Sequence, residues 1–221
     1  MNASPRKRTV SWALYDWANS AFATTVMAGF FPIFFKQYWS QDAVITESTF
    51  YLGIGNSLAS LVIVILAPVL GAMADTGGLR KRMLAGFASL GILATGALYL
   101  VQAGMWPFAI LLYAIAVVGF SGANTFYDAL LVIVAPPTKR HRVSAFGFAL
   151  GYLGGGILFL VNVLMTLKPH IFGLADAAEG VRWSFISVAV WWTLFSFSLF
   201  FYVDGPLPMA GRRHVSFQLA F

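Results

Sequence analysis

Long apolar stretches recur along the chain, and they restrict the fold more than any other feature. A helix needs about 20 apolar residues to cross the hydrocarbon core of a bilayer. No stretch shows the sustained alternation of apolar and polar residues that a membrane β-strand requires. The sequence therefore predicts an all-α membrane protein with six transmembrane helices. These cover residues 11–38, 50–73, 83–103, 106–134, 143–167 and 182–203.

The composition supports this interpretation. Of the 221 residues, 59% are hydrophobic and 10% are charged, whereas soluble domains carry roughly 25% charged residues. The net charge of +6 does not indicate nucleic-acid binding, because the basic residues form short clusters between apolar runs. The chain has no cysteine, which excludes disulfides and thiolate metal sites. We expect neither a metal nor a cofactor.

The basic clusters predict the orientation of the chain. In the six-helix arrangement they all fall on one side of the membrane, and basic loops stay in the cytoplasm. Both termini are therefore predicted to be cytoplasmic. The expected parts are a basic N-terminal segment at 1–10, a transmembrane domain at 11–203 and the start of a cytoplasmic central linker at 204–221. The clusters lie at residues 6–8, 80–82, 139–142 and 212–213.

Polar residues interrupt the first predicted helix. Asp16, Asn19 and Ser20 share one helical face, because residues three and four positions apart are neighbours on a helix. Asp16 lies about 9 Å inside the helix start, by the rise of 1.5 Å per residue. One interpretation is that Asp16 lines a pathway. The other is an anchor at the membrane interface, favoured by the positive end of the helix dipole.

The fourth predicted helix carries a similar stripe, formed by Ser121, Asn124, Thr125 and Asp128. Asp128 is expected to lie at a depth similar to that of Asp16, measured from the cytoplasmic end of its helix. Each aspartate follows a tyrosine in the sequence. The helix dipole disfavours an anion at this C-terminal end, so Asp128 needs a proton, water or a partner. Ionisable residues inside spans usually face a cavity or pathway, although a salt bridge to a residue of the 139–142 cluster is an alternative. The candidate pathway and coupling residues are Asp16, Asn19, Asn124, Tyr127 and Asp128.

Two glycine patterns predict close contacts. Gly147, Gly151 and Gly155 recur every four residues in the fifth predicted helix, and such a stripe lets another helix approach. The second pattern is the turn after the second helix. Its candidate gating residues are Gly71, Asp75, Gly78, Arg80 and Lys81, with Gly71 expected to allow close packing.

These motifs resemble a known family. The spacing G-x-x-x-D-x-x-G-x-R-K over residues 71–81 is similar to the loop signature of the major facilitator superfamily, although Thr76 replaces its usual basic residue. The segments LYDWANSAFATTVMAGFFPIFFKQYW and FYDALLVIVAPPTKRHRVSAFGFALGYLGGG resemble the vacuolar effluxer branch linked to autophagy and its bacterial relatives. In the second segment, Val132 departs from a common proline.

The resemblance to this effluxer branch implies a secondary-active transporter with twelve helices in two halves, each made of two three-helix inverted repeats. This chain matches the amino-terminal half. The implied partners are a small solute such as an amino acid, a coupling proton, the lipid bilayer, and either the missing C-terminal half or a second copy. A bacterial inner membrane is the implied location. Asp75, Arg80 and Lys81 would be gating residues.

Two other functions compete with transport. A membrane-embedded enzyme would need a catalytic constellation, yet His141, His170 and His214 all fall in predicted loops and no catalytic motif is present. A non-transporting six-helix module, or a fragment of a longer chain, fits the sequence better than an enzyme does.

Overall fold

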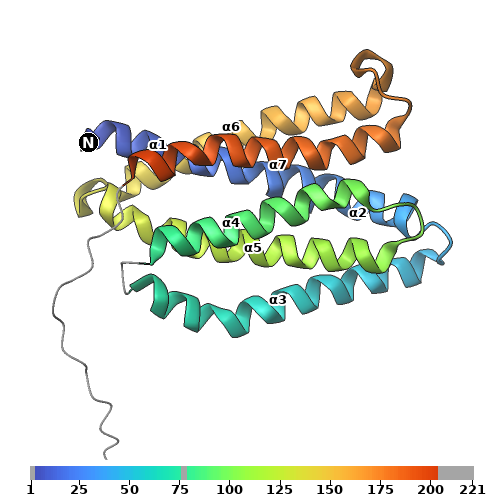
Figure 1. Cartoon of the computed structure of the whole chain (residues 1–221), viewed down its shortest axis with the longest axis horizontal. Helices are drawn as coiled ribbons and strands as arrows, with labels where there is room; N and C mark the ends of the chain where they lie inside the picture. Colours follow the sequence, from blue (N-terminus) through green and yellow to red (C-terminus); the bar gives the residue numbers. More distant parts are fainter. Residues whose placement is uncertain (1–2, 76–78, 204–221) are drawn as a thin grey trace, which may run out of the picture.

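The computed structural model describes residues 3–75 and 79–203 of the chain. This part contains six helical segments that are long and apolar enough to cross a membrane, and it contains no strand (Figure 1). The predicted all-α fold with six spans is therefore confirmed. The first span consists of α1 (Pro5–Ala21), η1 (Phe22–Phe30), α2 (Phe31–Phe34) and η2 (Phe35–Trp39). The others are α3 (Ile45–Asp75), α4 (Arg80–Ala97) with η3 (Leu98–Leu100), α5 (Trp106–Val134), η4 (Pro137–Lys139) with α6 (Arg140–Leu167), and α7 (Ala177–Tyr202), which follows η5 (Pro169–Phe172).

Capping residues start two helices earlier than the apolar pattern predicts. The hydroxyl of Ser4 accepts a hydrogen bond from the backbone N–H of Lys7 at 3.4 Å, and Pro5 begins α1. In the same way, the carboxylate of Asp176 accepts from the backbone N–H of Glu179 at 2.8 Å, so α7 begins at Ala177 rather than at residue 182. A polar first turn cannot be recognised by its hydropathy. It is nevertheless helical here, because the side-chain caps satisfy free backbone N–H groups at the helix start.

The first span is irregular. Its η1 and η2 segments are π-helical, which the apolar pattern does not reveal. Extended π segments are rare, and single π turns often mark functional positions. In η1, Gly29 lies so close to Phe159 of α6 that a Cβ atom would approach the ring to 2.7 Å.

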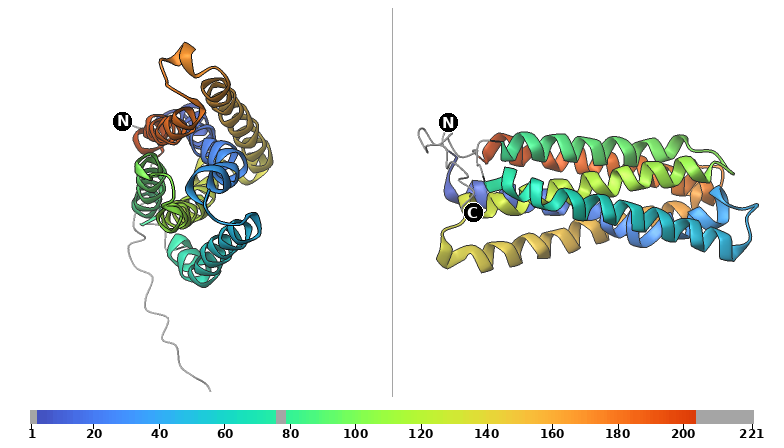
Figure 2. Two further views of the ribbon diagram at one scale, coloured as in Figure 1. Left: turned by 90° about the vertical axis from the view of Figure 1, so that its right-hand side faces the viewer. Right: turned by 90° about the horizontal axis from the view of Figure 1, so that it is seen from below.

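The first helix of each three-span group packs against helices of the other group. The first helix, α1, packs mainly against α6 and α7, whereas α5 packs mainly against α3 and α4 (Figure 2). The first three spans begin with α1, and the last three begin with α5. Each of these two helices packs on the second and third spans of the other group. This is the arrangement expected of two three-helix repeats. The two leading helices, α1 and α5, also contact each other.

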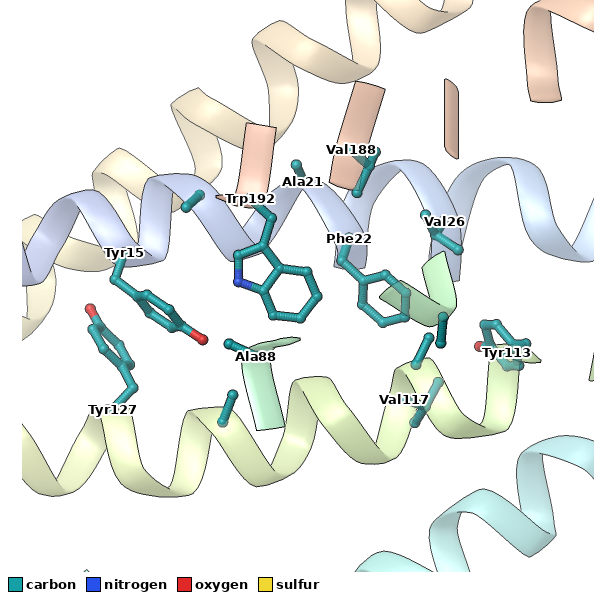
Figure 3. Packing of buried hydrophobic residues seen from close by; sticks show 14 of the residues in the cluster. Tyr15, Ala21, Phe22, Val26, Ala88, Tyr113, Val117, Tyr127, Val188 and Trp192 are labelled. Atoms are coloured by element: carbon teal, nitrogen blue, oxygen red, sulfur yellow. The ribbon is translucent and has the colours of Figure 1, made fainter. Parts of the chain in front are cut away.

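Aromatic side chains fill the core. Trp192 of α7 and Phe22 reach into the space between α1 and α5, with ring centroids 5.8 Å apart (Figure 3). Both are fully buried. Glycines make room for this packing: a Cβ atom on Gly91 of α4 would lie 2.7 Å from the Trp192 ring.

The closest approach between α4 and α5 depends on Gly119, which lies directly against the backbone of Gly91. We expect Gly119→Ala to lower the free energy of unfolding by about 1–3 kcal/mol, because the added methyl group must push two backbones apart. Gly86→Ala on α4 is the matched control, since nothing lies within 4 Å of its Cβ position. Thermal unfolding in detergent, followed by tryptophan fluorescence, measures both. Equal stability of the two variants would contradict this close contact.

Candidate functional site

Asn19 and Asn124 join the polar stripes of the first and fourth spans. The side-chain amide of Asn19 on α1 donates a hydrogen bond to the side-chain oxygen of Asn124 on α5. Asn19 is buried and Asn124 is half-buried. A buried amide is costly unless it is paired, so this bond helps to hold α1 and α5 together.

An aromatic cluster reinforces the same contact. The indole of Trp12 stacks on the ring of Tyr127 with centroids 4.4 Å apart, and its N–H donates to the backbone carbonyl of Tyr127 at 3.1 Å. The ring of Tyr15 lies 5.0 Å from that of Tyr127 (Figure 3). Tyr127 is therefore buried in the α1–α5 contact and is not on the exposed face that carries Asp128. The sequence pattern did not indicate the part played by Trp12.

The carboxylate of Asp16 points toward α6. It accepts a hydrogen bond from the hydroxyl of Ser20 at 3.1 Å. A Cβ atom on Gly151 of α6 would lie 2.9 Å from the Asp16 carboxylate oxygen. The polar face of α1 is therefore divided, because Asp16 and Ser20 lie against α6 while Asn19 meets α5.

The glycine stripe of α6 lies along α1. Gly147 lies beside Trp12, and a Cβ atom there would approach the indole to 2.8 Å. Gly155 would bring a Cβ atom to 2.8 Å from the hydroxyl of Thr24. Gly151 completes the row, so every member of the stripe faces a side chain of the first span. The small residues allow α6 to approach the polar groups of α1 closely.

Asp128 lies one helical turn from Asn124 on α5, and it is exposed in this six-helix unit. Arg140 does not pair with it: the guanidinium Nε donates instead to the carbonyl of Ala135 at 3.3 Å. In the described part of the chain, Asp128 forms no ion pair with Lys139 or Arg142 either. The alternative in which a basic residue of this cluster reaches back to Asp128 is therefore not observed.

The first two residues of α4 contact the ends of other helices. The Nε of Arg80 donates to the carbonyl of Ala74 in the last turn of α3. The ammonium of Lys81 donates to the carbonyl of Phe200 near the end of α7, at 2.9 Å. Basic side chains commonly cap the last carbonyls of helices.

Three gating candidates remain, namely Gly71, Asp75 and Gly78. Gly78 lies outside the described residues, as does the side chain of Asp75. A Cβ atom on Gly71 would meet nothing within 4 Å. The expected close packing at Gly71 is therefore not observed among the described residues.

The structure offers no candidate metal site in residues 3–75 and 79–203, since no three ligating side chains gather there. His141 lies in the first turn of α6 and His170 in η5, at opposite ends of the bundle. His214 lies outside the described residues.

Comparison with known proteins decides the family. The family model described as vacuole effluxer Atg22 like matches residues 4–51 and 43–213, which include the α1–α5 contact and both intramembrane aspartates. The chain belongs to this family. The predicted resemblance to the vacuolar effluxer branch is thereby confirmed.

Two similar proteins are about twice as long as the part that this chain matches. It is 36% identical over 211 residues to a Bacillus subtilis (strain 168) protein named as an uncharacterized MFS-type transporter, YxiO; the match covers 95% of this chain and 49% of that protein. It is also 27% identical over 172 residues to an uncharacterized protein of Aquifex aeolicus (strain VF5), covering 77% of this chain and 42% of that protein. The chain thus spans about half the length of the curated relatives it matches. No solved structure matches it.

The chain is an integral multi-pass membrane protein of a transporter family. The names of the family and of the Bacillus protein point to transport rather than enzyme chemistry.

Proposed function

We propose that this chain is the amino-terminal half of a secondary-active transporter that moves a small solute across a bacterial inner membrane by alternating access. The observation that carries the proposal is the buried pairing of Asn19 with Asn124, which joins the leading helices of the two repeats beside two intramembrane aspartates. Buried polar groups inside a membrane bundle are costly and are usually retained for function.

Asp128 is the best candidate for solute or proton binding. It is exposed in the six-helix unit, and a second half packed against this unit would enclose it in a cleft. A carboxylate there can bind a proton, or an amino group such as that of an amino acid. Asp16 lies at the edge of the same region against α6 and is the second candidate.

Alternating access needs the half to move as one body. Asn19, Asn124 and Tyr127 would hold α1 and α5 together during this movement. The glycine stripe of α6 would keep α6 on α1.

We also propose that Asp75, Arg80 and Lys81 form a gate at the cytoplasmic end. The proposal is supported by the bonds of Arg80 and Lys81 to the ends of α3 and α7.

The orientation is part of the proposal. Three described basic clusters, in the first turns of α1, α4 and α6, lie at one end of the bundle, where α7 also ends (Figure 1). The positive-inside rule assigns this end to the cytoplasm.

A six-helix module that does not transport, or that acts only as a pair of copies, is the alternative, because the chain spans half the length of its relatives.

Labelling of single cysteines tests the proposed pathway without knowledge of the solute. The 221-residue chain has no native cysteine, so Asp128→Cys provides a unique thiol in this half, and any cysteine of the other half is replaced by Ser. In the full-length protein, we expect a membrane-impermeant maleimide to label position 128 several-fold faster than position 126. Phe126→Cys is the control, because Phe126 is fully buried two residues away.

If position 128 reacted only with membrane-permeant reagents, it would face lipid and the pathway would be wrong. Solute flux through vesicles that contain the 221-residue chain alone would favour the alternative of paired copies.

A further inference from the structure

A polar seam runs along the glycine stripe of α6, where oxygen atoms from two other helices lie against the glycine backbone. A Cβ atom on Gly147 would lie 3.2 Å from the hydroxyl oxygen of Tyr127. One on Gly151 would lie 2.6 Å from the hydroxyl of Ser20 and 2.9 Å from the carboxylate of Asp16. Positions four residues apart are neighbours on a helix, so no side chain of α6 separates these oxygens.

The hydroxyl of Tyr127 has an unusual position in the polar seam. The side chain rises from α5 toward α1 (Figure 3), and it is 4% exposed. Its hydroxyl has no hydrogen-bond partner among the described residues, although an unpaired buried hydroxyl is costly. Tyr127 precedes Asp128 in the chain, yet the charge of Asp16 acts on it more strongly than that of Asp128 does. Tyr127 therefore links the helix of Asp128 to the surroundings of Asp16.

Asp16 has no cation beside it in the described part of the chain, where its hydrogen-bond partner is the hydroxyl of Ser20. The helices that pack on α1 supply none, because residues 143–167 of α6 and 183–201 of α7 contain no Lys, Arg, His, Asp or Glu. A charged carboxylate inside a membrane is costly without a cation, so Asp16 is suited to bind a proton. The other titratable groups of these surroundings are Tyr15 of α1, Tyr127 and Asp128 of α5, and the exposed Tyr152 of α6.

The two intramembrane aspartates differ in what surrounds them. The groups around Asp16, namely Ser20, Tyr127 and Gly151, all belong to this chain. Asp128, in contrast, is exposed in the six-helix unit, so a second half is needed to enclose it. One carboxylate therefore has its partners within this half, and the other does not.

We propose that Asp16 binds the coupling proton and that the hydroxyl of Tyr127 delivers it, which leaves Asp128 to the solute. The proposal rests on the proposed transport function. In the delivery step, the Tyr127 oxygen accepts a proton from a hydronium ion of the cleft, which becomes water. The original O–H bond of Tyr127 breaks, and its proton forms an O–H bond on the Asp16 carboxylate. Tyr127 is neutral before and after the step, and the reverse sequence releases the proton.

Proton exchange tests the proposal without knowledge of the solute. Infrared spectroscopy of the full-length protein follows the band of protonated carboxyl groups as the pH is lowered. The part of the band that is lost in Asp16→Asn belongs to Asp16, and Asp128→Asn should keep it. After transfer into D₂O, we expect Tyr127→Phe to slow the exchange of the Asp16 proton about tenfold or more, because only a hydroxyl can both accept and donate a proton there.

Tyr113→Phe is the matched control for loss of the hydroxyl. Tyr113 also belongs to α5 and is 4% exposed, but it stacks on Phe31, away from the polar seam. This variant should keep the exchange rate of the wild-type protein. Tyr127→Phe retains the ring that stacks on Trp12, so the contact between α1 and α5 should persist.

A second pair of variants tests the role of the glycine stripe. Gly151→Ala places a methyl group against the Asp16 carboxylate and should slow the exchange as well. Gly154→Ala is equally crowded, because its methyl group would lie 2.6 Å from the Trp17 ring, but it faces no group of the polar seam. It should leave the exchange rate unchanged.

Three results would overturn the proposal. The first is the lack of an infrared band for Asp16 at every pH at which the protein stays folded. The second is exchange in Tyr127→Phe as fast as in Tyr113→Phe, which would exclude delivery by the hydroxyl. The third is solute transport by Asp16→Asn that still responds to an imposed pH gradient, since we expect this response to be lost. If the wild-type protein transports no solute, the proposed function fails, while the infrared measurements still decide whether Asp16 takes up a proton through Tyr127.

Discussion

Solute transport by the full-length protein is expected to fall about tenfold or more when Asp128 is replaced by Asn, because a charged hydrogen-bonding group contributes about 1.5–3 kcal/mol. Asn has nearly the same size, but it can neither carry a charge nor exchange a proton. Asp128 is exposed and has no ion-pair partner in the described part of the chain, so its substitution should leave the fold unchanged. Uptake of a panel of radiolabelled amino acids into proteoliposomes, with and without an imposed pH gradient, measures the effect.

Asp42→Asn is the control for this experiment, because Asp42 is an exposed residue in the connection between the first span and α3. Asp16→Asn should have a smaller effect than Asp128→Asn, since Asp16 is half-buried and is already bonded to Ser20. Transport by Asp128→Asn that is unchanged and independent of the gradient would remove Asp128 from the pathway.

Replacing Trp12 with Ala is expected to cost about 3–5 kcal/mol of stability, the range found for truncating large buried aromatic residues. Trp12 is 2% exposed, stacks on Tyr127 and bonds to its backbone carbonyl. The substitution would leave a cavity where α1, α5 and α6 meet. Denaturation of the purified protein in mixed detergent micelles gives the change in free energy.

Two further variants show which interaction matters. Trp12→Phe keeps the stacking but loses the indole N–H, so it should cost only about 1–3 kcal/mol. Trp183→Ala is the control for loss of a tryptophan, because Trp183 is 39% exposed. Equal losses at Trp12 and Trp183 would mean that the α1–α5 contact contributes little to stability.

Much of the fold could be predicted from the chain alone. The apolar runs indicated six spans because hydropathy is a local property that depends only on neighbouring residues. The helix starts at Pro5 and Ala177 were missed, since a capped polar turn looks like a loop on a hydropathy scale. Even so, the Ser-Pro and Asp-Ala-Ala-Glu patterns at these positions are recognisable start signals.

The candidate site was predicted only in part. Periodicity placed Asp16 and Asn19 on one face of the first span, but it could not say which neighbour each would meet. In the structure Asn19 bonds to Asn124, whereas Asp16 lies beside Gly151. The same limit applies to Tyr127, whose buried position depends on Trp12 and Tyr15 of another helix.

The sequence by itself determined the membrane environment, the number of spans, the family and the identity of the polar residues inside the membrane. Only the tertiary structure decided that Asn19 pairs with Asn124 and that Asp128 stays exposed in the six-helix unit. The physical reason is that burial in a bilayer depends on the composition of one segment. Pairing, in contrast, depends on the rotation of each helix about its axis, and that rotation is set by side chains distant in the sequence.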